Sequence, residues 1–153
     1  MSCCQTQVRP ILHYIHKIHL GLRDQLDDLI EKTLAPRSQL IAEYLLKQEK
    51  LLEEALHQSM KGADAGTLDA FVDAKFNLDS ENVLEKAILP AAPGVDDLTG
   101  PFFIARDSII EILKESARSA SDRKAKELLL SLWKLEENER NLIARSVMQL
   151  DDM

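Results

Sequence analysis

Aromatic residues and positive charge are both scarce in this chain of 153 residues. Aromatic side chains make up 5% of it, and its formal net charge at pH 7 is -7. Binding to nucleic acid calls for a basic groove and stacking rings, and an anionic membrane surface also attracts positive charge. The composition therefore argues against both of these partners.

Long apolar runs are missing as well. No uninterrupted apolar stretch approaches the roughly 18 residues of a membrane span. The N-terminal segment MSCCQTQVRP lacks the apolar core of a signal peptide. We therefore expect no membrane span, no secretion signal and a cytoplasmic location.

Cysteine occurs only twice, at the adjacent positions Cys3 and Cys4. Neighbouring cysteines make a poor structural disulfide, and they cannot join distant segments. A redox or soft-metal pair is the functional alternative. The interpretation we favour is two exposed thiols in a frayed terminus, residues 1–7.

The remaining composition is that of a single globular domain spanning residues 1–153, with 45% hydrophobic and 29% charged residues. Proline, glycine and capping residues divide it into stretches with helical periodicity. The long helices are expected at residues 8–33, 38–61, 101 to about 120 and 122 to about 150. Two shorter helical patterns cover residues 68–76 and 80–89, and no alternating pattern predicts a strand.

The loops between these helices predict the topology. The turns near Pro36 and Ser121 are short, so each joins two antiparallel neighbours. The segment 63–100 is too long for a turn and must travel the length of the bundle. The sequence therefore predicts an all-α four-helix bundle of two antiparallel hairpins, with a long helical crossover between helices two and three.

The stretch KLEENER, residues 134–140, places charges on the inner face of the last helix. Helical periodicity of about 100° per residue puts Glu136 and Glu139 inside the apolar stripe and Glu137 outside it. The same analysis finds polar residues within or beside the stripes of the other three helices. The polar layer expected at mid-bundle consists of Arg106, Glu136, Glu139, His19, Gln48 and Arg23.

Arg106 is expected to neutralise this layer. If the second hairpin turns near Ser121, Arg106 lies opposite Glu136. A buried carboxylate is costly unless it is paired and hydrogen-bonded, and arginine supplies five donors while staying charged. We therefore expect a buried ion cluster of Arg106 with Glu136 and Glu139, completed by His19 and Gln48.

Two segments resemble the ferritin-like superfamily, in particular its rubrerythrin-type branch. They are ARSASDRKAKELLLSLWKLEENERNL, around the last helix, and AEYLLKQEKLLEEAL in the second helix. The resemblance covers the four long helices and the crossover. It implies a ferritin-like fold and a diiron centre made of a Glu on each of two helices and a Glu-x-x-His on each of the other two.

The ligand positions depart from that pattern. Helix one offers His19 or Arg23, and helix three offers Arg106. Helices two and four offer Gln48-x-x-Leu51 or Glu49-x-x-Leu52, and Glu136-x-x-Glu139 or Glu137-x-x-Arg140. The one literal Glu-x-x-His, Glu54 to His57, points outward. We therefore expect no cofactor, with Arg106 supplying the positive charge that metal supplies in the family.

Metal binding remains the alternative. Iron or manganese would draw its ligands from His19, Glu49, Glu136, Glu137 and Glu139. A second, surface site would use His13, His16 and His57, with Glu53 or Glu54. His13 and His57 lie level in the first hairpin but point away from the core, and surface histidines at helical spacing are common.

Three functions are compatible with these features. The first is a non-catalytic ferritin-like bundle that acts through association with itself, as a dimer, or with a protein partner. The second is a metal-dependent oxidoreductase or iron-handling protein with atypical ligands. The third is a carrier that holds a small apolar ligand in the bundle core.

Overall fold

The computed structural model describes residues 5–32, 34–73 and 78–151. Within these ranges the chain forms six helices and one small two-stranded sheet. The expectation of an all-α class is confirmed. None of the described helices combines the length and the apolar character needed to cross a bilayer.

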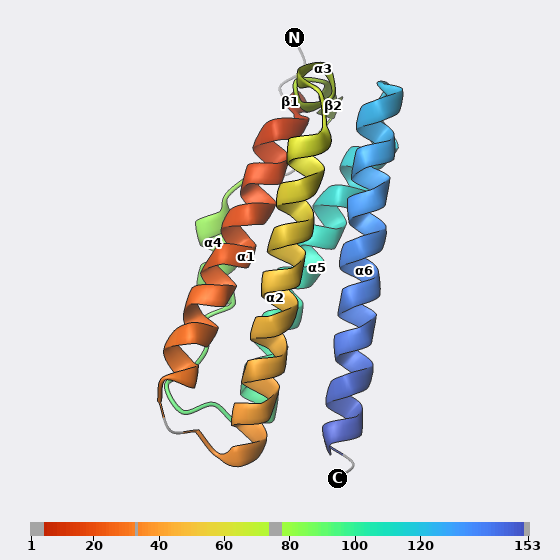
Figure 1. Cartoon of the computed structure of the whole chain (residues 1–153). Coiled ribbons are helices and arrows are strands. Elements are labelled where there is room, and N and C mark those ends of the chain that lie inside the picture. The colour runs from red at the N-terminus through yellow and green to blue at the C-terminus, as the bar shows by residue number, and fades with distance from the viewer. Residues whose placement is uncertain (1–4, 33, 74–77, 152–153) are drawn as a thin grey trace.

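Four long helices form the body of the molecule: α1 (Val8–Ile30), α2 (Pro36–Gly62), α5 (Val95–Ser119) and α6 (Arg123–Asp151). In Figure 1, α1 descends and α2 returns beside it, then α5 ascends and α6 descends beside it. Pro36 opens α2 at its first position, where its missing N–H leaves no hydrogen bond unmade.

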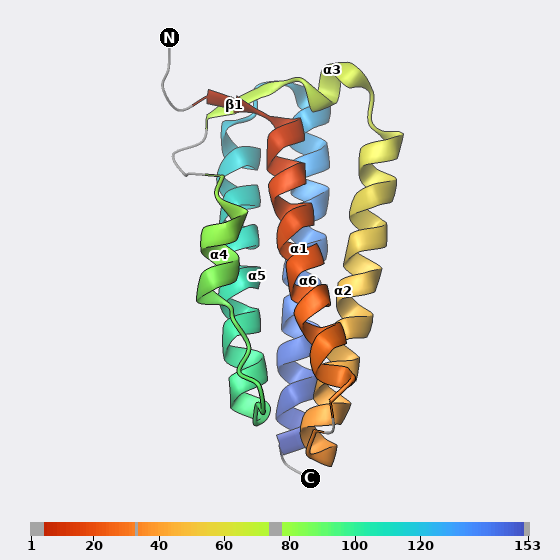
Figure 2. The ribbon, with the colours of Figure 1, turned by 90° about the vertical axis from the view of Figure 1, so that its left-hand side faces the viewer.

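The crossover runs back down the bundle on the side of α1 and α5 (Figure 2). It contains α3 (Ala65–Leu68), β2 (Phe71–Asp73) and α4 (Ser80–Lys86). At the top, β2 pairs antiparallel with β1 (Gln5–Gln7), with Thr6 opposite Val72. This pairing ties the start of the chain to the crossover.

The two strands correct the sequence-based expectations. Residues 5–7 were expected in a frayed terminus, but they form β1. Residues 68–76 were expected in a helix, but only Leu68, the last residue of α3, is helical among those described, and Phe71–Asp73 form β2. Only Val72 of β2 is buried, so the alternation covers three residues and is too short to be recognised. Residues 1–4, with Cys3 and Cys4, and residues 74–77 lie outside the described part of the chain.

Helix α5 starts at Val95, six residues earlier than expected, so Pro101 lies inside it. The Gly94 N–H donates to Asp97 Oδ2 at 3.0 Å, and Asp96 and Asp97 place negative charge in the first turn. Carboxylates there stabilise a helix through its unpaired N–H groups and its dipole. These interactions stabilise a helix start at Val95, whereas Pro101 considered alone predicted a start at residue 101.

Aspartates also begin α4 and α6. Asp79 Oδ1 accepts a hydrogen bond from the Asn82 N–H at the start of α4, at 3.1 Å. Asp122 Oδ2 accepts one from the Ala125 N–H at the start of α6, at 2.9 Å. Both pairs follow the pattern of N-caps, so aspartate rather than the neighbouring serine fills this role at both sites.

Helix α4 is held against α1 by one close approach and one side-chain clasp. A Cβ added at Gly21 would lie 2.6 Å from Leu84 Cδ1, so α4 packs where α1 has no side chain. One turn on, Gln25 Nε2 donates to the Ala87 carbonyl at 3.3 Å, and Gln25 Oε1 accepts from the Leu89 N–H at 2.8 Å. The crossover thus docks on specific features of α1.

A pair of glycine substitutions tests this docking. Gly62→Ala at the end of α2 should raise the free energy of unfolding by about 0.4–1 kcal/mol, because the site is helical, its φ is not positive and nothing lies within 4 Å of the added Cβ. Gly21→Ala should lack this gain, because Leu84 must move off α1. Urea unfolding measures both, and an equal gain at the two sites would show that α4 does not pack closely there.

Candidate functional site

Four charged side chains, one from each long helix, meet in the core. They are His19 of α1, Glu49 of α2, Arg106 of α5 and Glu136 of α6, and we call them the charge ring. His19, Glu49 and Arg106 are 0% exposed and Glu136 is 4% exposed. Cations and anions alternate around the ring, so two positive and two negative charges cancel.

His19 bridges the two carboxylates. Its Nδ1 lies 2.6 Å from Glu49 Oε2, and its Nε2 lies 2.5 Å from Glu136 Oε1. Only the imidazolium form can donate from both nitrogens. The geometry therefore assigns a proton to each ring nitrogen of His19.

Arg106 closes the ring on the opposite side. Its Nη1 donates to Glu136 Oε2 at 3.0 Å. Its Nη2 lies 3.1 Å from Glu49 Oε1, an ion pair that is not aligned as a hydrogen bond. The guanidinium also lies over Phe102, with Cζ 4.9 Å from the ring centroid. Each carboxylate thus contacts both cations.

The neighbouring charges decide the protonation of the ring. Burial alone would lower the pKa of His19, but the charges of Glu136 and Glu49 and their hydrogen bonds raise it to about 10. Burial likewise opposes the charged form of Glu136, but His19 first and Arg106 second lower the pKa of that carboxyl below its ordinary value. At neutral pH His19 is therefore an imidazolium and Glu136 a carboxylate.

Three of the six residues expected in the polar layer, His19, Arg106 and Glu136, meet in the ring. The other three lie elsewhere. Gln48 is 7% exposed but makes none of the ring contacts. Arg23 is half-buried and donates to Glu53 Oε2 at 2.7 Å, on the side of α1 facing α2.

Glu139 was expected opposite Arg106, and this expectation is corrected. Glu49 and Glu136 are the carboxylates beside Arg106. Glu139 is half-buried, and its Oε2 has no hydrogen-bond partner among the described residues. Glu139 lies about 60° around α6 from Glu136 at helical periodicity, which turns it away from α5.

The other candidate ligands lie outside the ring. Glu137, Glu54, His13 and His57 are exposed. His16 is half-buried, with Nε2 3.7 Å from Glu53 Oε1. In the described part of the chain, no three side chains of His, Cys, Asp or Glu are arranged to hold a metal ion.

The sequence analysis placed Gln48 at the centre of the apolar stripe of α2, and Glu49, which belongs to the other helical register, only among alternative metal ligands. A usable signal was present in the spacing. His19 and Glu49 are 30 residues apart, and so are Arg106 and Glu136. Two hairpins that repeat one cation-to-glutamate spacing indicate one shared layer.

Comparisons with family models, with curated proteins and with solved structures found no match for this chain.

The charge ring does not fit the dinuclear metal centre that the sequence resemblance implies. Such a centre needs several anionic ligands and free donor atoms. Here both nitrogens of His19 face carboxylate oxygens, and Arg106 contacts the remaining carboxylate oxygens of Glu49 and Glu136. A metal ion would bring further positive charge to a group whose charges already cancel.

The protonation of His19 predicts how stability depends on pH. In the folded chain the proton is held up to a pKa of about 10, whereas in the unfolded chain it is lost near the ordinary histidine pKa of 6.5. The contribution of His19 is therefore complete below pH 6.5 and falls as pH rises toward 10. The contribution of Glu136 is complete above the ordinary glutamate pKa of 4.5 and falls at lower pH.

Urea unfolding at pH steps between 6 and 10 measures this slope. The double variant His19→Gln/Glu136→Gln keeps the ring neutral and should lose the part of the slope that His19 supplies. His13→Gln, at an exposed histidine, should keep it. The same slope in all three proteins would mean that His19 is neutral when folded.

A double-mutant cycle tests the ion pairing. Arg106→Met should lower the free energy of unfolding by about 3–5 kcal/mol, because it leaves a buried excess negative charge. Adding Glu49→Gln restores neutrality, so the double variant should lose less than the sum of the two single losses. Arg140→Met, which removes the half-exposed pair with Asp107, should cost only about 0–1 kcal/mol. Strict additivity of Arg106 and Glu49 would contradict the pairing.

Proposed function

We propose that the chain is a non-catalytic ferritin-like helical bundle whose charge ring takes the place of the metal centre, and that it acts by associating with a second copy of itself. The single observation that carries this proposal is the closed, neutral ring built from one residue of each long helix. The order of helices and the position of the crossover support the ferritin-like assignment.

Burial of the ring favours a structural role. A catalytic acid or base must reach its substrate, but all four ring residues lie in the core. The surface pocket between α1 and α5 is lined by Tyr14, Asp107, Ser108, Glu111 and Ile112, none of which belongs to the ring. The ring is therefore suited to holding helices together.

Association is supported by leucines along the seam between α2 and α6. Tyr44 of α2 and Ser146 of α6 are hydrogen-bonded across this seam at 3.2 Å. Leu51 lies seven residues after Tyr44 and Leu142 four residues before Ser146, so helical periodicity places both on the same side. Leu51 is 55% exposed and Leu142 is 40% exposed.

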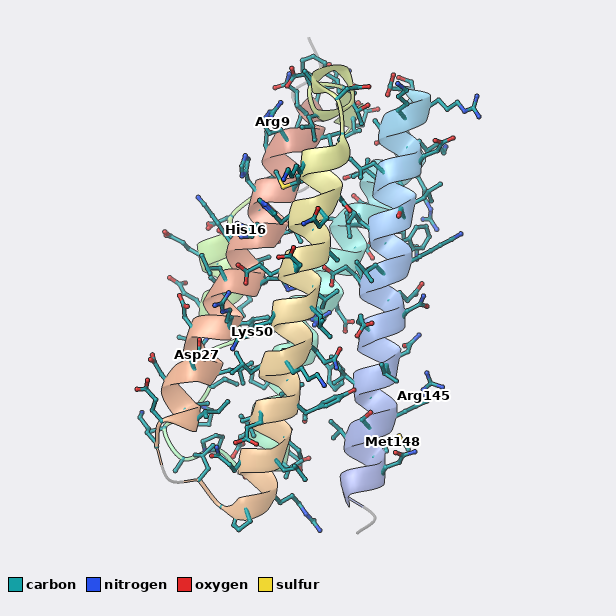
Figure 3. The ribbon with its side chains drawn as sticks, viewed as in Figure 1. Arg9, His16, Asp27, Lys50, Arg145 and Met148 are labelled. Carbon is teal, nitrogen blue, oxygen red and sulfur yellow. The ribbon has the colours of Figure 1, made fainter. Side chains whose placement is uncertain are left out.

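A second copy suits this seam because one apolar stripe can face itself across a two-fold axis. The seam is also distinct from the outer side of α6, where Arg145 and Met148 project away from the bundle (Figure 3). We therefore place the proposed contact between copies along α2 and α6.

One experiment tests both parts of the proposal. Untagged protein is incubated with Fe(II) or Mn(II) under nitrogen, passed over a desalting column, and measured for bound metal and for mass by light scattering. We expect the wild type and Glu136→Gln to differ by less than about 0.1 bound ion per chain. Light scattering should give the mass of a dimer. Leu51→Glu with Leu142→Glu should give a monomer, while Met148→Glu should stay dimeric.

Three outcomes would overturn the proposal. Iron or manganese that is lost with Glu136→Gln would support a metal-dependent oxidoreductase or iron-handling protein. A wild-type monomer, or a dimer that both seam substitutions leave intact, would reject association along α2 and α6. An organic ligand that co-purifies and is detected by mass spectrometry would support the carrier alternative.

A further inference from the structure

Three of the four histidines of this chain lie outside the charge ring, on the first hairpin. His13 and His16 belong to α1, and His57 belongs to α2. His13 and His57 are exposed, and the His16 side chain is 40% exposed. Figure 3 shows His16 on the upper half of α1, beside α2. None of these rings is needed for the core.

The contact between His16 of α1 and Glu53 of α2 shows that His13 and His57 lie at one level of the hairpin. His16 faces Glu53, with Nε2 3.7 Å from Oε1. From His16 back to His13 is about 4.5 Å along α1, and from Glu53 on to His57 is about 6 Å along α2. Because the helices are antiparallel, both steps go in the same direction, so His13 and His57 end up level.

The angular positions agree with this placement. Residues three or four apart share a helix face, with Cβ atoms about 5–6 Å apart. His13 and His16 are three apart on α1, and His57 follows Glu53 by four on α2. Both pairs therefore lie on the outer side of the hairpin, where His16 and Glu53 already meet.

The carboxylate of Glu53 lies beside His16 and is held in place by Arg23. Arg23 Nη1 donates to Glu53 Oε2 at 2.7 Å, and the guanidinium and hydrogen bond of Arg23 lower the pKa of Glu53 despite its partial burial. The second oxygen of Glu53 faces His16 Nε2. At 3.7 Å this contact is an ion pair, and a small movement of the His16 ring would make it a hydrogen bond, which orients the other imidazole nitrogen toward a metal ion.

We infer that His13, His16 and His57 form a surface site for Zn²⁺, with Glu53 as the positioning residue for His16. In the described residues the side chains do not already converge on one point. His13 and His57 are exposed, so their rings can reorient and close the site when the ion binds. Three imidazoles with one open position are a common ligand set for zinc.

This site differs from the charge ring in both place and chemistry. It uses neutral imidazoles at the surface, whereas the ring uses charged groups in the core. An ion held by both α1 and α2 would join the two helices of the first hairpin. The inference does not depend on the proposed function, since it requires only the geometry of α1 and α2.

The test is a Zn²⁺ titration by calorimetry at pH 7.5 on untagged full-length protein. The chain carries Cys3→Ser and Cys4→Ser, because thiolates are themselves zinc ligands. We expect one ion per chain. His57→Ala and His13→Ala should each weaken zinc binding by more than about 10–100-fold. That range is typical of losing a residue that only hydrogen-bonds to a metal ligand, and the loss of a ligand itself should cost more. Glu54→Gln, a neighbouring exposed carboxylate on α2, is the matched control and should retain the affinity.

Histidine side-chain NMR spectra supply the second readout. Added Zn²⁺ should shift the resonances of His13, His16 and His57 and leave those of His19 unchanged. The inference is overturned if no zinc binds, if His57→Ala binds it as tightly as the parent, or if the resonances of His19 respond. Loss of zinc with Glu136→Gln but not with His57→Ala would also overturn it.

Discussion

The pairing of two buried cations with two buried carboxylates constrains the whole bundle, because a charge removed from water is tolerated only when opposite charge lies within a few ångströms. His19, Glu49, Arg106 and Glu136 each come from a different long helix. A shift of any one helix along its axis by a turn would separate its charge from two partners. Apolar packing tolerates small shifts far better, since it has no direction. The ring therefore sets the relative heights of four helices whose leucines and isoleucines alone would permit several registers.

This constraint is also the physical basis for the proposed non-catalytic role of the charge ring. Catalytic groups commonly work because one charge is left unbalanced or one donor is left free. In the charge ring, the two carboxylates and the imidazolium engage one another, and Arg106 lies between Glu49 and Glu136 and over Phe102. The charge ring is therefore most stable when all four side chains keep their contacts with one another. The histidines of the first hairpin are the opposite case, because His13 and His57 lie exposed with ring nitrogens open to an incoming ion.

Sequence periodicity correctly predicted the features that depend on residues close together in the chain. The four long helices follow from apolar spacing and from capping residues such as Asp122, and the burial of His19, Arg106 and Glu136 follows from their positions within apolar stripes. The expectations that were wrong depend on contacts between distant segments. The strand at Phe71–Asp73 exists because Gln5–Gln7 lies beside it. Glu49 rather than Gln48 joins the ring because Glu49 is the residue of α2 that faces His19 of α1 and Arg106 of α5, and the apolar spacing within α2 alone does not show where those two helices lie.

The ring also has a consequence for how copies of this chain could exchange parts. Each hairpin carries its own pair of opposite charges, His19 with Glu49 in the first and Arg106 with Glu136 in the second. The remaining two contacts join the hairpins to each other. A second hairpin donated by another chain would bring the same two side chains to the same places, and the long crossover provides the connecting length. The contacts of the charge ring are therefore the same whether the second hairpin comes from the same chain or from another chain. Assembly within one chain is favoured instead by the crossover, which packs on Gly21 and is hydrogen-bonded to Gln25 of α1.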